Sequence, residues 1–154
     1  MKTLAVISLC IFVTCLQQIE AACPTGSSAQ GSYCFIASKS EQKYTSAWIF
    51  CKAAGCNLAV PDTTDKRTQL KSFMSSNSIV DSNVFFGSVD AIVEGTWVKS
   101  PTGETWSDIN WATSEPSGGS NQNCLSVKSS TGTWEFEAKS CGSSYKFICE
   151  CDAV

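Results

Sequence analysis

The chain contains no histidine, and this absence excludes several classes of function. Histidine is the usual general acid or base near neutral pH and a common zinc ligand. The sequence also lacks a nucleophile-elbow motif and a phosphate-binding loop. We therefore expect a binding protein rather than an enzyme.

Long apolar runs are missing too, except for one near the N-terminus. Residues 4–16 form a nearly uncharged apolar stretch, and Ala21 and Ala22 follow as small residues. This run is shorter than the roughly 20 residues of a membrane-spanning helix and is typical of a secretory signal peptide. We predict that residues 1–21 are a signal peptide and that residues 22–154 form one secreted domain without membrane insertion.

Positive charge is scarce: 11 Lys and Arg stand against 14 Asp and Glu, for a formal charge of −3 at pH 7. Proteins that bind nucleic acid usually carry a basic patch, and lipid-anchored proteins carry a lipidation motif. The sequence shows neither. We expect no nucleic-acid partner, and the oligomeric state, including a homo-oligomer, stays open.

Cysteine, in contrast, is abundant. Cys10 and Cys15 fall in the predicted signal peptide, which leaves an even number in the mature chain. An even number in a secreted chain predicts a disulfide framework, here of four bridges, although many pairings are open. A zinc site is disfavoured, because paired CxxC motifs and histidines are missing. The remaining cysteines are Cys23, Cys34, Cys51, Cys56, Cys124, Cys141, Cys149 and Cys151.

Apolar spacing and turn residues predict two helices. Residues 45–54 have helical composition, with Thr45 or Ser46 as the cap and Gly55 at the end. The face that carries Ala47 and Cys51, flanked by Ile49, should be buried. A second helix begins after the capping pair Asp62–Thr63, with Asp65 in its first turn, and its inner face carries Leu70, Phe73 and Met74.

Short strands and one long irregular segment complete the pattern. Residues 103–122 are rich in turn residues but include Trp106 and Trp111, which we expect to anchor the segment to the core. A hairpin closed by a disulfide is expected over residues 23–35. Strands are expected at residues 57–60, 84–87, 96–99, 125–127, 134–137 and 146–150.

Seven short motifs occur in one order along the chain. They are Ala47-x3-Cys51-x3-Gly55-x-Asn57-Leu58-Ala59, Val84-Phe85-Phe86-Gly87-Ser88, Glu94-Gly95-Thr96-Trp97, Asn110-Trp111, Ser114-Glu115-Pro116-Ser117, Asn123-Cys124 and Phe147-Ile148-Cys149-Glu150. In this order the chain resembles the C-type lectin-like domain over residues 23–151. The resemblance implies an α+β fold, in which two helices flank antiparallel sheets and disulfides brace a long irregular loop.

The resemblance also implies the disulfide pairing. Cys51 should pair with Cys149 and tie the first helix to the last strand, and Cys124 should pair with Cys141 beneath the long loop. A bridge between Cys23 and Cys34 would close the N-terminal hairpin of the longer form of the domain. The two cysteines that then remain, Cys56 and Cys151, are expected to form the fourth bridge.

In sugar-binding members of this family, a Ca²⁺ ion sits in the long loop and binds the sugar. The resemblance assigns its ligands to a Glu-Pro-Asn or Gln-Pro-Asp triplet with a cis proline, an acid before the next cysteine and an Asn-Asp pair on the following strand. Glu115 and Pro116 match this pattern. Ser117 replaces the Asn or Asp, and Gln122 stands where the acid is usual.

Two alignments remain open for the strand pair. Counted from Trp134 it is Glu135–Phe136, and counted back from Cys141 it is Glu137–Ala138. In a strand both glutamates share one face, opposite Trp134 and Phe136. That face is either solvated or binds Ca²⁺. The predicted metal ligands are Glu115, Ser117, Gln122, Glu135 and Glu137, and the predicted carbohydrate-binding residues are Glu115, Ser117, Gln122 and Glu137.

The resemblance therefore predicts a secreted lectin that recognises microbial or host glycans, with Ca²⁺ as the expected cofactor and innate immune recognition as a plausible setting. The triplet Glu115-Pro116-Ser117 is neither the Glu-Pro-Asn nor the Gln-Pro-Asp form, so the resemblance does not predict which sugar is bound. Trp97, Trp106, Trp111 and Trp134 are expected in the core rather than in sugar stacking. The alternative is a calcium-independent interaction or matrix protein on the same fold, without a sugar site.

Overall fold

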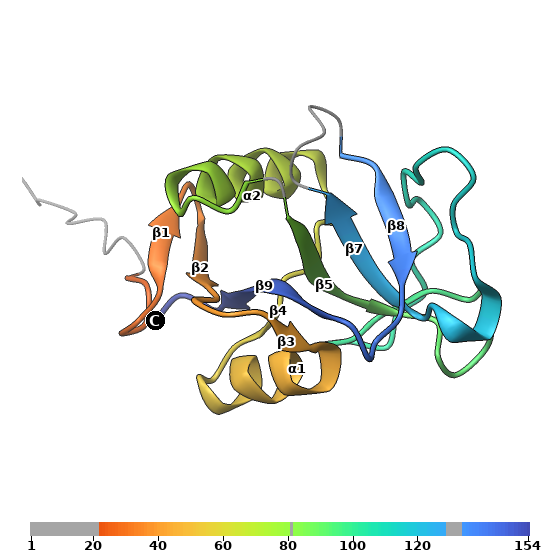
Figure 1. Cartoon of the computed structure of the whole chain (residues 1–154). Coiled ribbons are helices and arrows are strands. Elements are labelled where there is room, and N and C mark those ends of the chain that lie inside the picture. Colours follow the sequence, from red (N-terminus) through yellow and green to blue (C-terminus); the bar gives the residue numbers. More distant parts are fainter. Residues whose placement is uncertain (1–21, 81, 129–133) are drawn as a thin grey trace, which may run out of the picture.

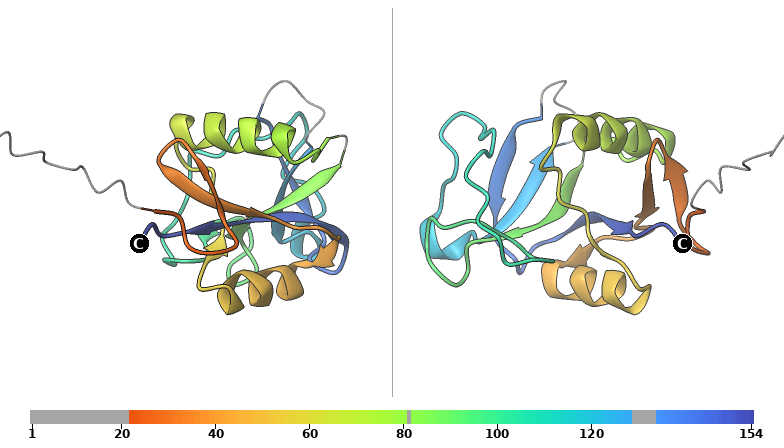
Figure 2. Two further views of the ribbon diagram at one scale, coloured as in Figure 1. Left: turned by 90° about the vertical axis from the view of Figure 1, so that its left-hand side faces the viewer. Right: turned by 180° about the vertical axis from the view of Figure 1, so that it is seen from behind.

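The computed structural model describes residues 22–80, 82–128 and 134–154. The predicted signal peptide lies outside the described residues and stays a prediction. Within the described ranges, no helix combines the length and hydropathy that crossing a bilayer requires. Two helices lie on opposite sides of the strands, with α2 on one side and α1 on the other (Figures 1 and 2). The α+β class that the sequence predicts is confirmed.

The strands follow the order β1-β2-β9-β5-β7-β8, with β3 and β4 paired to β9 and β6 paired to β5. Most pairings are antiparallel, as expected, but β5 and β9 run parallel. The strands are β1 (Ser28–Gln30), β2 (Tyr33–Ala37), β3 (Gln42–Lys43), β4 (Asn57–Leu58), β5 (Asn83–Val89), β6 (Val98–Lys99), β7 (Cys124–Lys128), β8 (Phe136–Lys139) and β9 (Ser144–Cys151).

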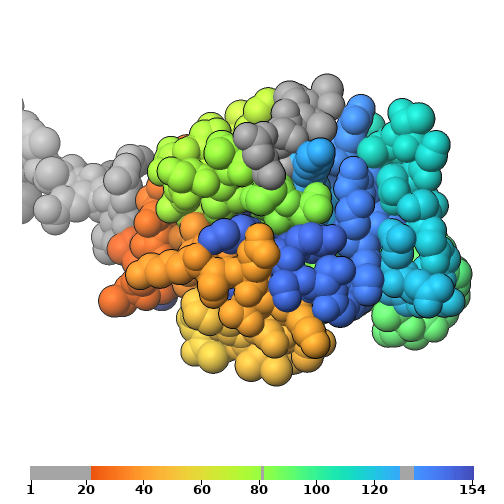
Figure 3. Space-filling view, in the orientation of Figure 1, coloured from red at the N-terminus to blue at the C-terminus, as the bar shows by residue number. Residues whose placement is uncertain are grey.

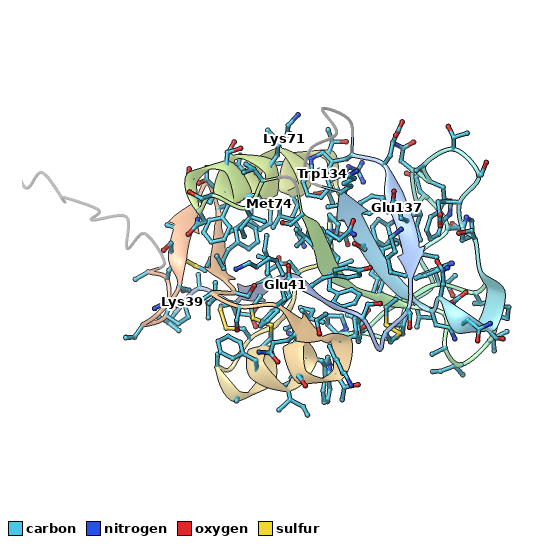
Figure 4. All side chains as sticks on the ribbon, in the orientation of Figure 1. Lys39, Glu41, Lys71, Met74, Trp134 and Glu137 are labelled. Carbon is cyan, nitrogen blue, oxygen red and sulfur yellow. A yellow bond between two sulfur atoms is a disulfide. The ribbon has the colours of Figure 1, made fainter. Side chains whose placement is uncertain are left out.

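Helix α2 (Thr64–Ser76) follows the sequence prediction closely. The Thr63 hydroxyl accepts a hydrogen bond from the Lys66 N–H at 3.2 Å and caps the helix. Leu70, Phe73 and Met74 are buried against the core. Figure 4 shows Met74 beneath the helix and Lys71 on its outer side. The sequence predicts this helix well, because its cap and its buried apolar residues are close together in the sequence.

Helix α1 (Tyr44–Ala53) departs from the prediction at its start. The expected cap at Thr45 or Ser46 is wrong: the helix begins at Tyr44, and no side chain caps it. Tertiary contacts replace the cap. The buried Tyr44 hydroxyl forms a hydrogen bond with the Ser100 hydroxyl at 2.8 Å, and the main-chain N–H of Tyr44 donates to the Cys141 carbonyl at 3.2 Å.

The buried face of α1 is also narrower than expected. Ala47 and Cys51 are fully buried, but Ile49 is 55% exposed. Successive residues of a helix are about 100° apart, so Ile49 lies on nearly the opposite side of the helix from Ala47. Its exposed neighbours Trp48 and Phe50 complete an apolar outer surface.

Strand β9 is the common partner of β2, β3, β4 and β5. Two disulfides at its end, Cys51–Cys149 and Cys56–Cys151, join it to α1 and to the residue before β4. Cys23–Cys34 closes the N-terminal hairpin of β1 and β2. Cys124–Cys141 joins the start of β7 to the turn before β9. All four pairings expected from the resemblance are formed.

The two long-range disulfides constrain the same part of the chain. Their sequence separations are 98 and 95, and their ends lie five and two residues apart. With one bridge intact, the other closes only a small ring through residues 51–56 and 149–151. From the loop-closure entropy, a bridge that closes this small ring should stabilise the fold by about 2.6 kcal/mol. A bridge that closes the full loop should stabilise it by about 4.7 kcal/mol.

We predict that removing these disulfides is strongly non-additive. The C51A/C149A and C56A/C151A variants should each lose about 2.6 kcal/mol of unfolding free energy in urea denaturation, because the other bridge remains. The variant without both should lose about 7 kcal/mol and unfold at 25 °C, since this approaches the whole stability of a domain. A loss equal to the sum of the two separate losses would contradict the redundancy.

Candidate functional site

The long loop, residues 100–123, connects β6 to β7 and forms a lobe beside β8 at one end of the molecule (Figures 1 and 3). Two tryptophans anchor it, as expected. Trp106 is 5% exposed, and its ring contacts the Phe136 ring with centroids 5.6 Å apart. Trp111 packs edge-on against Trp97 at 4.9 Å. The long loop has an irregular backbone, but the Trp106 and Trp111 rings fix it to the core.

The edge strand β8 receives the long loop through hydrogen bonds. The Phe136 N–H donates to the Asn110 carbonyl, and the Ala112 N–H donates to the Phe136 carbonyl, both at 2.9 Å. Two residues further along β8, the Ala138 N–H donates instead to the Glu115 carboxylate at 2.8 Å. The Glu115 side chain thus takes the place of a main-chain acceptor at the strand edge. An edge N–H would otherwise lack a protein partner there.

Glu115 also organises its own turn. Its peptide bond to Pro116 is cis, as the resemblance implied. The Ser117 N–H donates to one carboxylate oxygen at 3.0 Å, and the Ser117 hydroxyl lies 2.8 Å from the other. Together with the Ala138 N–H, three donors of this chain serve the carboxylate.

The pKa of Glu115 reflects these contacts. Partial burial by itself raises the pKa of Glu115. The hydrogen bonds from Ala138 and Ser117 and the positive charge of Lys139 outweigh burial, so the pKa of Glu115 lies below its ordinary value. The Glu115 carboxylate is therefore ionised at neutral pH, and as a carboxylate it accepts these hydrogen bonds.

Gln122 lies at the base of the loop tip, where the short 3-10 helix η1 (Gly119–Asn121) turns the chain toward β7. Gly118 has a positive φ of +81°, and a Cβ placed there would lie 2.5 Å from the Gln122 side chain. The Gln122 side chain therefore packs against the Gly118 backbone. This contact supports the turn.

The outward face of β8 carries Glu137 and Lys139, while Phe136 and Ala138 are buried. The Lys139 ammonium lies 2.7 Å from a Glu137 carboxylate oxygen. Figure 4 labels Glu137 on β8, the strand beside the long loop. Trp134 contacts the Phe136 ring at 5.9 Å, so these two aromatics share the core side, as predicted.

Of the two glutamates that the alignments offer, Glu137 adjoins in sequence the residue that binds Glu115. Glu137 directly precedes Ala138, whose N–H binds Glu115, whereas Glu135 lies before β8 begins. In the pairing of β8 with β7, Glu137 faces Ser126 and Phe136 faces Val127.

Three of the predicted Ca²⁺ ligands, Glu115, Ser117 and Glu137, are engaged by groups of the chain itself. Ca²⁺ takes six to eight oxygen ligands. Among the described residues, no group of three or more Asp, Glu, His or Cys is placed to bind a metal. The Glu115 carboxylate already accepts from three donors, and the Glu137 carboxylate is paired with the Lys139 ammonium.

Two acidic residues beside the long loop were missed by the sequence analysis. Asp90, at the end of β5, is 3% exposed. One of its carboxylate oxygens accepts from the Gly95 N–H at 3.0 Å, and the other has no hydrogen-bond partner within the described part of the chain. Glu94 reaches toward Gly119. A carboxylate directly after a buried strand was the signal that could have identified Asp90.

A family model described as the lectin C-type domain matches residues 40–151, which is more than half of the chain. The chain belongs to the C-type lectin domain family. Domains of this family bind ligands and are not enzymes. Many bind Ca²⁺ and others are calcium-independent, so membership leaves the cofactor open.

Individual proteins agree with this assignment. A tetranectin-like protein from Carcharhinus perezii is 28% identical over 136 residues, which cover 88% of this chain and 80% of that protein. Human lithostathine superposes with a TM-score of 0.76 at 26% identity and covers 89% of this chain and 95% of that chain. A calcium-independent type II antifreeze protein has the same fold, with a TM-score of 0.73 at 21% identity over 86% of this chain and 96% of that chain.

We predict that Glu115→Gln destabilises the C-type lectin domain by about 1–2 kcal/mol at pH 7, because charge-assisted hydrogen bonds are lost. The pKa of Glu115 is lowered by folding, so its stabilising effect is present above the unfolded-state pKa of about 4.3 and is lost as pH falls through the folded-state pKa. The free energy difference between wild type and variant, from urea denaturation, should therefore be constant near neutral pH and shrink as pH falls below about 5.

Glu41→Gln is the matched control, because Glu41 is exposed and lies outside the long loop. It should change the unfolding free energy by less than about 0.5 kcal/mol. A pH-independent difference for Glu115→Gln would show that its carboxylate does not stabilise the fold through its charge.

Proposed function

We propose that this protein is a secreted lectin that binds carbohydrate on the surface shared by the long loop and β8. The proposed binding residues are Glu115, Ser117, Gln122 and Glu137, and the proposed ligands are microbial or host glycans. Secretion is supported by the apolar N-terminal run and by the four disulfides, which form in oxidising compartments.

The hydrogen-bonded pair of Glu115 and Ser117 is the observation that carries this proposal. Sugar hydroxyls both donate and accept hydrogen bonds, so a sugar site needs acceptors and donors side by side. Glu115 offers a carboxylate, Ser117 a hydroxyl and Lys139 an ammonium, all half-buried within one small region. Because Ala138 holds Glu115 on the sheet, these groups are preorganised and lose little entropy on binding.

A glycan array probed in Ca²⁺ and in a chelator tests the proposal. We expect binding to at least one glycan, weakened about tenfold by Ser117→Ala and by Gln122→Ala, since one lost hydrogen bond costs about that factor. Ser40→Ala is the control, because Ser40 is exposed and lies between β2 and β3, outside the long loop. Absence of glycan binding in both buffers by the folded protein would refute the lectin assignment.

The second candidate is a calcium-independent interaction or matrix module without a sugar site. The observation that favours it is that Glu115 and Ser117 bond each other and the Ala138 N–H, and so serve the fold. A folded protein that gives no signal on the array in either buffer would favour this second candidate.

A further inference from the structure

A cavity of about 600 Å³ lies between α1, the end of β2 with its connection to β3, and β9. Its lining residues fall within residues 36–50 and at Phe147, outside the long loop. Figure 3 shows the β2–β3 segment and α1 next to each other on one face of the molecule, in orange and gold. The volume is within the range of small-molecule sites, so the cavity is a second candidate site.

Apolar side chains from three elements line this cavity. Phe147 on β9 is 2% exposed, and the Phe50 ring on α1 packs edge-on against it with centroids 5.4 Å apart. Phe50 and Ile49 are 49% and 55% exposed, and Ile36 on β2 is only partly buried. A ligand with a hydrocarbon part would cover these surfaces and remove them from water, which favours binding.

Two consecutive polar residues of the lining have unused hydrogen-bonding or charge capacity. Ser38 is 7% exposed, and its hydroxyl accepts a hydrogen bond from the Phe147 N–H at 2.9 Å. A hydroxyl can also donate one hydrogen bond, and the described residues provide no acceptor for the Ser38 proton. Lys39 forms no ion pair within the described part of the chain. The cavity therefore offers a donor and a positive charge at neighbouring positions.

The surroundings of the cavity are positively charged, although the whole chain has a formal charge of −3. The segments that contain its lining residues, 36–53 and 141–149, have one acidic residue, Glu41, which is exposed and does not line the cavity. Their four lysines are Lys39, Lys43, Lys52 and Lys146. The Lys146 ammonium donates to the Lys39 carbonyl at 2.7 Å and so lies beside the cavity. This charge distribution favours an anionic ligand.

We propose that this cavity binds an anionic amphiphile with a single hydrocarbon chain, such as a long-chain carboxylate. The carboxylate accepts the Ser38 proton and faces the Lys39 ammonium, and the chain lies against Phe50 and Phe147. A neutral hydrocarbon would leave the donor and the positive charge without a partner, and a small anion would leave the apolar side chains exposed. The cavity shares no residue with the proposed carbohydrate site, so the two proposals are independent.

Titration calorimetry with decanoate and dodecanoate at about pH 8, below the concentrations at which they form micelles, tests the proposal. From the usual binding energy per ligand atom, dodecanoate should bind with a Kd of about 1 mM or tighter. Each CH₂ group that enters the cavity should tighten the Kd about fourfold, so dodecanoate should bind about fifteenfold more tightly than decanoate. Dodecyltrimethylammonium has the same chain but a positive head group, and should bind at least about tenfold more weakly than dodecanoate.

A pair of phenylalanine variants tests the location. Ser46 is an exposed residue of α1 that lines the cavity, so Ser46→Phe should occupy the space of the chain and weaken dodecanoate binding at least about tenfold. Ala53→Phe is the matched control, because it adds the same side chain at an exposed position of α1 outside the cavity. It should leave the Kd within about twofold of wild type.

Three lysine variants test the charge. Lys39→Gln should weaken dodecanoate binding about fivefold, whereas Lys39→Arg should keep the affinity because it keeps the charge. Lys43→Gln is the control, since Lys43 is exposed and does not line the cavity, and solvent and salt screen its charge. If Ser46→Phe does not fold, the comparison of Lys39→Gln with Lys43→Gln decides the location instead.

Three results of these titrations would overturn the proposal. The first is that the folded wild-type protein gives no saturable heat with dodecanoate up to about 10 mM, well above the expected Kd. The second is dodecanoate binding that neither Ser46→Phe nor Lys39→Gln weakens, because the amphiphile would then bind elsewhere. The third is dodecyltrimethylammonium binding as tight as that of dodecanoate, because the positive charge would then have no role.

Two other occupants of this face are tested with the same protein. Cosedimentation with phosphatidylglycerol vesicles detects binding to an anionic bilayer, and sedimentation velocity detects a dimer. Either signal, if Ile49→Ser abolishes it and dodecanoate gives no saturable heat, would assign the face to a bilayer or to a second copy of the chain and overturn the proposal. None of these measurements uses a glycan, so their failure and the failure of the lectin assignment are distinguishable.

Discussion

Strand β9 carries hydrogen bonds to four other strands and is covalently tied to the first helix and to the residue before β4. Because it comes last in the chain, these contacts close nearly the whole domain. The main-chain N–H groups and carbonyls of Ala22 and Val154 also bond each other at 2.9 and 3.0 Å, which holds residue 22 beside Val154. The frame is therefore fixed by long-range contacts, and the long loop can be irregular without loss of order.

The long loop depends on this frame through one side chain. Glu115 belongs to the motif that the family uses for sugar, yet here its carboxylate satisfies an N–H at the edge of β8. This side chain completes the sheet edge and remains partly exposed to solvent. The same contact brings Lys139 close enough to act on Glu115, so the electrostatics of the site follow from how the loop docks.

Local signals predicted those elements whose determinants lie close together in the sequence. Helix α2 is an example, since Thr63 caps it and Leu70, Phe73 and Met74 form its buried stripe. The start of α1 could not be found in this way. Tyr44 begins that helix because its hydroxyl reaches Ser100 and its N–H reaches the Cys141 carbonyl, and both partners are distant in sequence.

The sequence by itself determined the family, the disulfide partners implied by that family and the position of the long loop, because these depend on residue identity and spacing. It also identified Glu115 and Pro116 as the residues to examine. Only the tertiary structure decided that the Glu115 carboxylate binds the Ala138 N–H and that Glu137 pairs with Lys139. Strand register and loop docking set which side chains meet, and neither is encoded in a local pattern.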